Sequence, residues 1–188
     1  GRMDQAIAKR TGLPVRVASD ALICVAMGAG QAMEEAAVLA EDVSFMNTHG
    51  TATVYNDEME SKAIHLAGLE TVPVHSLKSY FGHTLGASGV IESIICIHEL
   101  KENVLFGTLG YEKPGVSMPI LVQADHQEIP MKHCIKTASG FGGCNAAIVL
   151  TLPAYQKQPS RVQSSVTVHT TATVSIENSC LSMNGETV

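Results

Sequence analysis

Three polar loops follow three short apolar runs of the sequence. The apolar runs cover residues 43–46, 72–77 and 132–138, and the polar loops cover 47–56, 78–89 and 139–145. Apolar runs of this length between polar segments are typical of buried strands. In α/β sheets, functional residues gather where the ends of strands deliver loops. The pattern therefore predicts an α/β protein whose functional residues lie in these three loops.

The segments between and around these loops have the features of further helices and strands. A helix is predicted over 57–68, because Asn56 is a suitable N-cap and Gly68 is placed to end the helix. A second helix, over 90–101, has isoleucines on all sides, which is typical of a helix buried inside a layered protein. Helix-forming residues cover 32–39, and additional strands are predicted over 120–124, 145–152 and 166–176.

The composition excludes several classes of protein. Apolar residues make up 45% of the 188 residues, which is enough for a sizeable core and rules out a disordered chain. The longest apolar run, residues 21–30, is about half the length of a membrane-spanning helix. The net charge of −6 disfavours nucleic acid as a partner. We therefore expect neither a membrane nor a nucleic acid among its partners.

The five cysteines include no C-x-x-C pair, and no secretory signal is visible. These two observations predict free thiols and a cytoplasmic location. Cys144 follows the glycines of the third loop, and we interpret it as a small buried thiol rather than a nucleophile.

The three loops contain residues suited to one kind of chemistry. His49 lies in the first loop, Lys78 and His83 in the second, and Phe141 between glycines in the third. A neutral imidazole can donate a hydrogen bond to an oxyanion, and glycines let backbone N–H groups approach a substrate closely. Two imidazoles and an ammonium in one pocket would suit a reaction that develops a negative oxygen.

Simpler interpretations apply to most other polar residues. A zinc site made of His49, Asp57 and His83 has no support from ligand spacing. The second loop lacks the residue order of a nucleotide-binding loop. Glu58 and Lys62 are spaced as an exposed helix pair. The remaining histidines are expected to be surface or capping residues: His65, His75, His98, His126, His133 and His169.

At the three loops the sequence resembles the β-ketoacyl synthases of fatty acid and polyketide synthesis. Residues 47–60 resemble their N-x-H-G-T-x-T…N-D-x-x-E block, residues 78–92 their K-S-x-x-G-H-x-x-G-A-x-G block with a following Glu, and residues 140–145 their G-F-G-G-T-N turn. The blocks occur in the family's order and spacing. Ala52 replaces a glycine of the family, and Cys144 replaces a threonine.

The resemblance implies a thiolase-like layered α/β/α fold, of which this chain is the C-terminal half of a duplicated domain with a mixed sheet. Residues 1–153 would form this C-terminal ketosynthase domain and residues 154–165 a linker. Residues 166–188 would be a tail of unknown fold and a candidate for the start of another domain.

The resemblance also implies a chemistry, the decarboxylative Claisen condensation of an acyl thioester with malonyl-acyl carrier protein. The family's acylated cysteine lies in the N-terminal half, in a T-A-C-type motif that no cysteine of this chain matches. His49 and His83 would hydrogen-bond the thioester carbonyl of the malonyl unit. Lys78 would be held by Glu92, with Glu60 as a further candidate partner.

The implied binding residues lie in the first and third loops. Thr51 and Thr53 would bind the phosphopantetheine arm. The Phe141 backbone N–H would form half of an oxyanion hole, and its ring would gate the acyl channel. No metal or other cofactor is implied. The implied partners are acyl carrier protein, the N-terminal half that bears the cysteine, and a second copy of the complete protein. The isolated chain is expected to be inactive.

Three alternatives remain open at the level of the sequence. A non-catalytic, chain-length-type subunit would have the same fold, although such subunits tend to lose the histidines and lysine. A metal-dependent hydrolase would use His49, Asp57 and His83. A separate C-terminal subunit would be completed by another chain.

Overall fold

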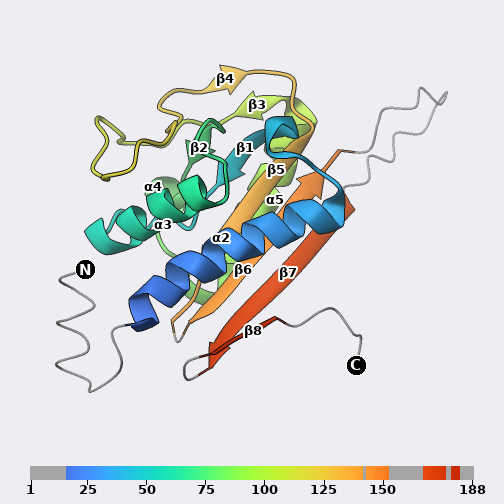
Figure 1. Cartoon of the computed structure of the whole chain (residues 1–188). Coiled ribbons are helices and arrows are strands. Elements are labelled where there is room, and N and C mark those ends of the chain that lie inside the picture. The colour runs from blue at the N-terminus through green and yellow to red at the C-terminus, as the bar shows by residue number, and fades with distance from the viewer. Residues whose placement is uncertain (1–15, 142, 153–166, 177–178, 183–188) are drawn as a thin grey trace.

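The computed structural model describes residues 16–141, 143–152, 167–176 and 179–182 (Figure 1). Its helices are α2 (Arg16–Ala36), α3 (Val54–Leu66), α4 (Lys78–Phe81) and α5 (Ser88–Glu102), with single 3-10 turns at Ala40–Asp42 and Leu85–Ala87. Its strands are β1 (Val43–Asn47), β2 (Val74–His75), β3 (Val104–Leu105), β4 (Gln127–Glu128), β5 (His133–Ser139), β6 (Cys144–Thr151), β7 (Thr167–Ile176) and β8 (Ser179–Ser182). None of the described helices is both long and apolar enough to cross a membrane.

The main sheet is mixed, as predicted. Its strand order is β2-β1-β5-β6-β7-β8. Strand β1 is parallel to both β2 and β5, whereas β5 through β8 pair antiparallel in sequence order. A parallel connection needs a crossover, and helix α3 supplies it between β1 and β2. Strands β3 and β4 form a separate antiparallel pair.

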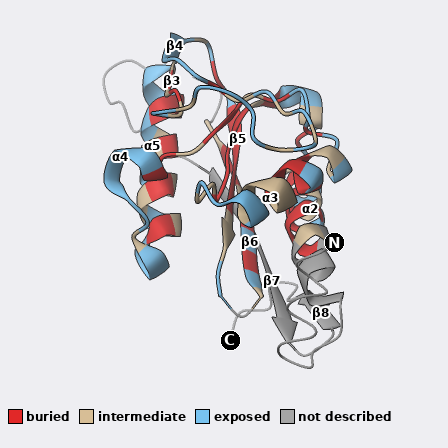
Figure 2. Ribbon diagram, turned by 90° about the vertical axis from the view of Figure 1, so that its left-hand side faces the viewer, coloured by how far each residue is buried: buried red, intermediate tan, exposed pale blue. Residues whose placement is uncertain are grey.

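Helices cover both faces of the sheet, which confirms the predicted layered α/β fold. Helices α2 and α3 lie on one face and α5 on the other (Figures 1 and 2). Because successive side chains of a strand point to opposite faces, neighbouring strand residues belong to different cores. Met46 and Ile135 pack in the core under α2 and α3, whereas Phe45 and Cys134 pack in the core under α5.

Helix α5 confirms the predicted helix but not its predicted burial on all sides. Its buried residues include Glu92, Cys96 and Glu99. By contrast, Val90 is 65% exposed and Ile94 is 51% exposed. The helix therefore turns polar groups into the interior and an apolar face away from the described part of the chain. The prediction assumed that hydrophobicity alone orients a helix, and here buried ion pairs and polar contacts decide the orientation.

Several element boundaries differ from the predictions. Helix α2 covers Arg16–Ala36, so of the helix predicted over 32–39 only residues 32–36 are helical, and they are the last part of a longer helix. Helix α3 begins three residues early, after Thr53, and Asn56 lies inside its first turn. The strand predicted over 72–77 is reduced to two residues, and the one predicted over 120–124 forms only a bridge between Val122 and Val74. Gly68 follows the end of α3, as predicted, with a φ of 70°.

Strand β7 belongs to the main sheet. The strand predicted over 166–176 is present as β7, which pairs antiparallel with the whole of β6. The linker predicted over 154–165 lies outside the described residues. The division of the chain into domains at these positions stays a prediction.

The cysteines differ in their environments. Cys96 and Cys134 are free and buried, whereas Cys144 is free and exposed, so the prediction of a buried thiol at Cys144 is wrong. Cys24 is disulfide-bonded, so the prediction of free thiols throughout is also wrong. A sequence pattern without C-x-x-C pairs says nothing about cysteines that meet through the fold.

Candidate active site

The polar loops meet because the strands before them are parallel. β1 and β2 both end at the same edge of the sheet, so the segment after Asn47 lies beside the segment after His75. At Gly50, a Cβ would lie 2.5 Å from the Ser76 Cβ, and the φ of Gly50 is +46°. The Ser76 hydroxyl donates to the Gly50 carbonyl at 2.8 Å. Only glycine allows the two loops to approach this closely.

A buried ionic cluster lies beneath these loops. Lys78 Nζ lies 2.7 Å from Glu92 Oε1, and Lys136 Nζ lies 2.6 Å from Glu92 Oε2. All three side chains are almost fully buried. The contact expected between Lys78 and Glu92 is therefore present. Sequence reasoning missed Lys136, although a single charged residue in the middle of an apolar strand was a signal that it has a buried partner.

Glu60 has another role than the expected contact with Lys78. Its carboxylate accepts hydrogen bonds from the backbone N–H groups of His49 and Gly50, each at 2.7 Å. It also accepts one from Asn56 Nδ2 at 2.7 Å. Burial raises the pKa of Glu60, and these hydrogen bonds act in the opposite direction. Glu60 thus fixes the backbone of the first loop.

The two histidines of the loops face each other. The ring centroids of His49 and His83 are 5.2 Å apart, and the rings are nearly perpendicular at 80°. His49 is buried, and its pKa is lowered to about 4, first by burial and then by the positive charges of Lys78 and Lys136. His49 is therefore a neutral imidazole near pH 7, which suits a hydrogen-bond donor to an oxyanion.

His83 is exposed, and its contacts select its tautomer. The backbone N–H of Leu85 donates to His83 Nδ1 at 3.2 Å. The Ser88 hydroxyl lies 3.0 Å from the same nitrogen. Because Nδ1 acts as the acceptor, the proton of the neutral ring is on Nε2. That N–H remains able to donate to a bound group.

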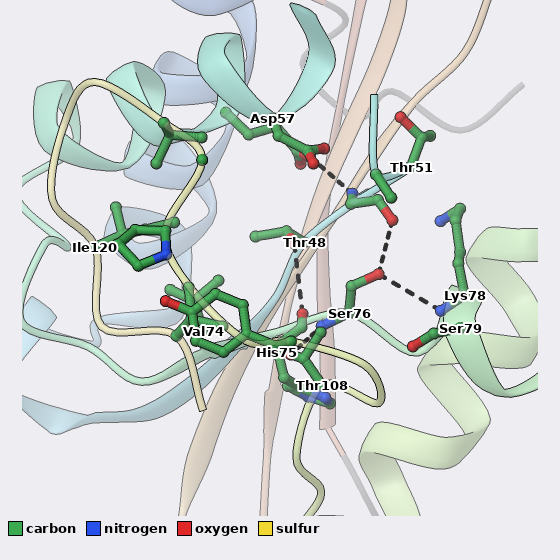
Figure 3. A pocket seen from close by; sticks show the side chains of 18 of the residues that line it. Thr48, Thr51, Asp57, Val74, His75, Ser76, Lys78, Ser79, Thr108 and Ile120 are labelled. Carbon is green, nitrogen blue, oxygen red and sulfur yellow. Dashed lines mark hydrogen bonds between the residues drawn. The ribbon is translucent and has the colours of Figure 1, made fainter. Parts of the chain in front are cut away.

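A cavity of about 630 Å³ opens beside His83. His49 does not line it, although the neighbouring Thr48 and Gly50 do. Figure 3 shows side chains that line it from the first loop, from α3 and from β2, among them Thr51, Asp57 and His75. Lys78 and His83 border it, and its walls include Ile64 and Val74. The cavity combines apolar walls with polar groups at one side, as is usual for small-molecule sites.

The predicted binding residues are only partly at this cavity. The hydroxyls of Thr51 and Thr53 are 2.9 Å apart, but only Thr51 lines the cavity. Phe141 is 94% exposed and does not line it either. The structure thus brings together His49, His83, Lys78 and Glu92.

A second buried polar cluster was not foreseen. His75 was expected at the surface, but it is buried next to Phe45, with 5.3 Å between the ring centroids. Its Nε2 lies 3.5 Å from Glu99 Oε2. Burial lowers the pKa of His75 to about 3 and raises that of Glu99 to about 7. Between about pH 3 and pH 7 the two groups therefore face each other with both side chains uncharged. His133 is likewise buried, whereas His98 and His126 are exposed.

The structure also bears on the metal hypothesis. Among the described residues, the only three potential metal ligands close enough to share an ion are His75, Cys96 and Glu99. The set His49, Asp57 and His83, on which a metal-dependent hydrolase would rest, does not form such a group there.

Solved ketosynthases share the layered α/β fold of this chain, which places it in the thiolase-like class of α/β proteins. The sequence model described as "Beta-ketoacyl synthase, C-terminal domain" matches residues 16–112. The chain belongs to this family.

Relatives and solved structures agree with this assignment. The chain is 34% identical over 131 residues to "Putative polyketide beta-ketoacyl synthase 1" of Streptomyces cyaneus, covering 68% of this chain and 31% of that protein. It is 30% identical over 120 residues to "Polyketide biosynthesis malonyl-ACP decarboxylase PksF" of Bacillus subtilis, covering 64% of this chain and 29% of that protein. A crystal structure of a β-ketoacyl synthase from Burkholderia phymatum superimposes with a TM-score of 0.62 at 31% identity, covering 66% of this chain and 31% of that one. The chain spans about a third of the length of the curated relatives it matches.

Proposed function

We propose that this chain supplies the histidine and lysine half of an active site that joins an acyl thioester to a malonyl unit on acyl carrier protein. The observation that carries this proposal is the pair of facing imidazoles, His49 and His83, above the buried Lys78–Glu92 ion pair. The names of the relatives support it, because they include polyketide synthases and a malonyl-ACP decarboxylase. No cofactor is needed beyond the phosphopantetheine arm that carries the substrate.

In the proposed reaction, negative charge develops on the thioester oxygen, to which the two histidines can donate hydrogen bonds. The C–C bond to the malonyl carboxylate breaks, carbon dioxide leaves, and the electron pair becomes an enolate whose negative charge lies on the thioester oxygen. That oxygen accepts hydrogen bonds from the N–H groups of His49 and His83, which are stronger in the transition state than in the ground state. The enolate carbon then attacks the acyl thioester, and the cysteine thiolate leaves.

The remaining predicted residues have supporting roles in this proposal. Glu92 holds Lys78, whose ammonium also donates to the His49 carbonyl. The field of Lys78 stabilises negative charge near the histidines. Thr51 and Thr53 bind the phosphopantetheine arm with their paired hydroxyls. The Phe141 N–H forms half of the oxyanion hole, and its ring gates the acyl channel.

An uncovered apolar face supports the need for a second half. Phe81, Leu85, Val90 and Ile94 are all exposed, and they belong to α4, α5 and the turn between them. An apolar surface of this kind usually marks an interface. In our proposal it is covered by the N-terminal ketosynthase half, which carries the nucleophilic cysteine, and the complete protein forms a homodimer.

The proposal assigns the acylated residue to that other half. When the complete enzyme is incubated with an acyl thioester and digested, peptide mass mapping should find the acyl group outside this chain. Cys144 is the exposed free cysteine to watch, since a stable adduct there would overturn this division of the site.

The central test removes each histidine in the complete enzyme. We expect His49→Ala and His83→Ala each to slow malonyl decarboxylation by about 10²–10³-fold, because each removes one donor to the oxyanion. Acylation of the cysteine should fall less. His126→Ala is the control, because His126 is exposed and its ring packs against Tyr80 and Phe106. If both loop-histidine variants decarboxylate at the parent rate, the proposed function is wrong.

The second candidate function is a non-catalytic, chain-length-type subunit. Structures titled as ketosynthase–chain length factor pairs are 26% and 27% identical to this chain, so the alternative has a specific basis. The retained His49, Lys78 and His83 favour the catalytic role. If neither the parent enzyme nor the two histidine variants decarboxylate malonyl thioester, the result favours the chain-length role.

The gate at Phe141 has its own test. Because its side chain is 94% exposed, Phe141→Gly should leave the melting temperature within a few degrees of the parent. The rate of acylation and the preference for acyl length should change. A large drop in melting temperature with unchanged acyl preference would instead make Phe141 a packing residue in the complete enzyme.

A further inference from the structure

Lys136 occupies an unusual position for a lysine. It lies in the middle of β5, between Ile135 and Thr137, and all three residues are buried. Lysine is almost never fully buried without a partner, because the ammonium loses its hydration. The resemblance to the family assigned no role to this position.

The partners of Lys136 all belong to the candidate site or adjoin it. Its ammonium lies 2.6 Å from Glu92 Oε2 and donates to the carbonyl of Thr48 at 3.3 Å. It also donates to the carbonyl of Thr137 at 2.5 Å. The ammonium thus donates hydrogen bonds to two carbonyls and forms an ion pair with one carboxylate.

The two lysines make matching contacts on either side of Glu92. Lys78 takes one carboxylate oxygen and the carbonyl of His49, and Lys136 takes the other oxygen and the carbonyl of Thr48. These two carbonyls are consecutive and lie directly after the end of β1. The ammonium groups thus tie down the backbone that carries the His49 imidazole.

The charges of this cluster do not cancel. Two ammonium groups share one carboxylate, which leaves an excess of one positive charge when all three groups are ionised. Glu60 is nearby, but its oxygens accept hydrogen bonds from His49, Gly50 and Asn56. Burial lowers the pKa of Lys136, and Glu92 acts against that shift.

We propose that Lys136 is a positioning residue of this site, which fixes the Thr48–His49 backbone and places a second positive charge beside the His49 imidazole. The consequence is that His49 remains neutral at lower pH than Lys78 alone would allow. The other titratable or charged groups that face His49 are Lys78, His83, Glu92 and Glu60. The link to decarboxylation rests on the proposed function, whereas the effect on His49 does not.

The test replaces Lys136 by an uncharged side chain of similar length. In the complete protein, labelled with ¹³C-histidine, the His49 resonance is identified as the one lost in His49→Ala. Titration should show that Lys136→Met raises the pKa of His49 by about 1 unit, the size expected when one nearby like charge is removed. The acid limb of the decarboxylation pH profile should move upward with it.

A matched control is available at Lys132, which directly precedes strand β5. Lys132→Met also removes one positive charge, but the Lys132 side chain is exposed, and its backbone N–H donates to Ser44 Oγ at 2.9 Å. It should leave the pKa of His49 and the pH profile unchanged. Lys136→Met is expected to fold, because Lys78 and Glu92 remain as an ion pair without net charge. A circular dichroism melt verifies the folding of the variant.

The outcomes separate the two proposals. An unchanged pKa of His49 in folded Lys136→Met overturns this inference, whatever happens to the reaction rate. A raised pKa of His49 supports it, even if neither the parent nor the variant decarboxylates malonyl thioester, a result that would contradict only the proposed function. Loss of rate without any shift of the His49 pKa would make Lys136 a purely structural residue and would also overturn the inference.

Discussion

Glu92 and Glu99 lie two turns apart on the inner side of α5, and both are buried from solvent. Their surroundings differ in charge. Glu92 contacts the ammonium groups of Lys78 and Lys136. Glu99 faces the neutral imidazole of His75 and the thiol of Cys96, and it accepts one backbone hydrogen bond from Phe106 at 2.9 Å.

The difference shows that burial alone does not determine how a carboxylate behaves. Burial raises the pKa of Glu99 to about 7, and in the part of the chain that the structure describes no cation lies against it to favour the charged form. At Glu92, two ammonium groups compensate the charge, and the ion cluster lies under the candidate catalytic loops. One helix therefore carries a charged cluster toward the site and a neutral cluster toward β2.

The largest expected effect is the difference in stability between two conservative substitutions. Glu92→Gln leaves two buried ammonium groups without a carboxylate and should cost about 3–5 kcal/mol of unfolding free energy. At pH 8, Glu99→Gln should cost no more than about 1 kcal/mol, because it removes a carboxylate that burial already disfavours in its charged form. Urea denaturation measures both, with the exposed Glu102→Gln as a control on the same helix. Equal costs at the two buried positions would contradict the comparison.

The next effect concerns pH. Because the pKa of Glu99 rises from 4.5 to about 7 on folding, the native protein holds a proton between pH 5 and 7 that the unfolded chain has lost. Stability from this group therefore falls as the pH rises through that window, by about 1.4 kcal/mol per unit. Glu99→Gln has no carboxyl group to titrate and does not lose stability in this way. The unfolding free energy of Glu99→Gln minus that of the parent should therefore increase by about 1.4 kcal/mol per pH unit and level off above pH 7.

Urea denaturation at pH 5, 6 and 7 measures the pH effect. Glu102→Gln should show no such slope relative to the parent, because its side chain is exposed. A flat difference between Glu99→Gln and the parent across the window would mean that Glu99 is already ionised at pH 5.

A smaller effect tests whether Glu92 and Lys78 act together. Glu92→Gln should cost less in a Lys78→Met background, since only the ammonium of Lys136 is then left without its carboxylate. The coupling energy should lie between about 0.5 and 3 kcal/mol. Strictly additive costs in this double-mutant cycle would show that the two side chains do not interact in solution.

The smallest effect is at Cys96. Its thiol favours the charged form of Glu99 by a hydrogen bond, so Cys96→Ala should raise the pKa of Glu99 further. The pH transition described for Glu99 should then move upward by less than about 1 unit. Cys144→Ala, at an exposed thiol, should not move it. A downward shift in Cys96→Ala would assign the thiol the opposite influence.

The sequence predicted those features whose causes are local. The apolar runs that became β1, β5 and β6, the helix at α5 and the polar loops after the strands depend on periodicity and on residues close in the chain. The family blocks also marked His49, Lys78, His83 and Glu92, which the structure brings together. The start of α3 was misplaced because Asn56 is a good N-cap by type, yet its side chain instead donates to Glu60.

Only the tertiary structure decided which polar residues became partners. Lys136 and the Thr48 carbonyl are 88 residues apart in the chain, and they meet because β5 pairs with β1. His75 is buried for a similar reason, since β2 lies against β1 and over α5. Side-chain pattern specifies which segments form strands, but the order of strands in the sheet depends on packing between distant segments. The sequence by itself therefore determined the loops and their chemical groups, and the packing of the sheet decided which charges stand beside them.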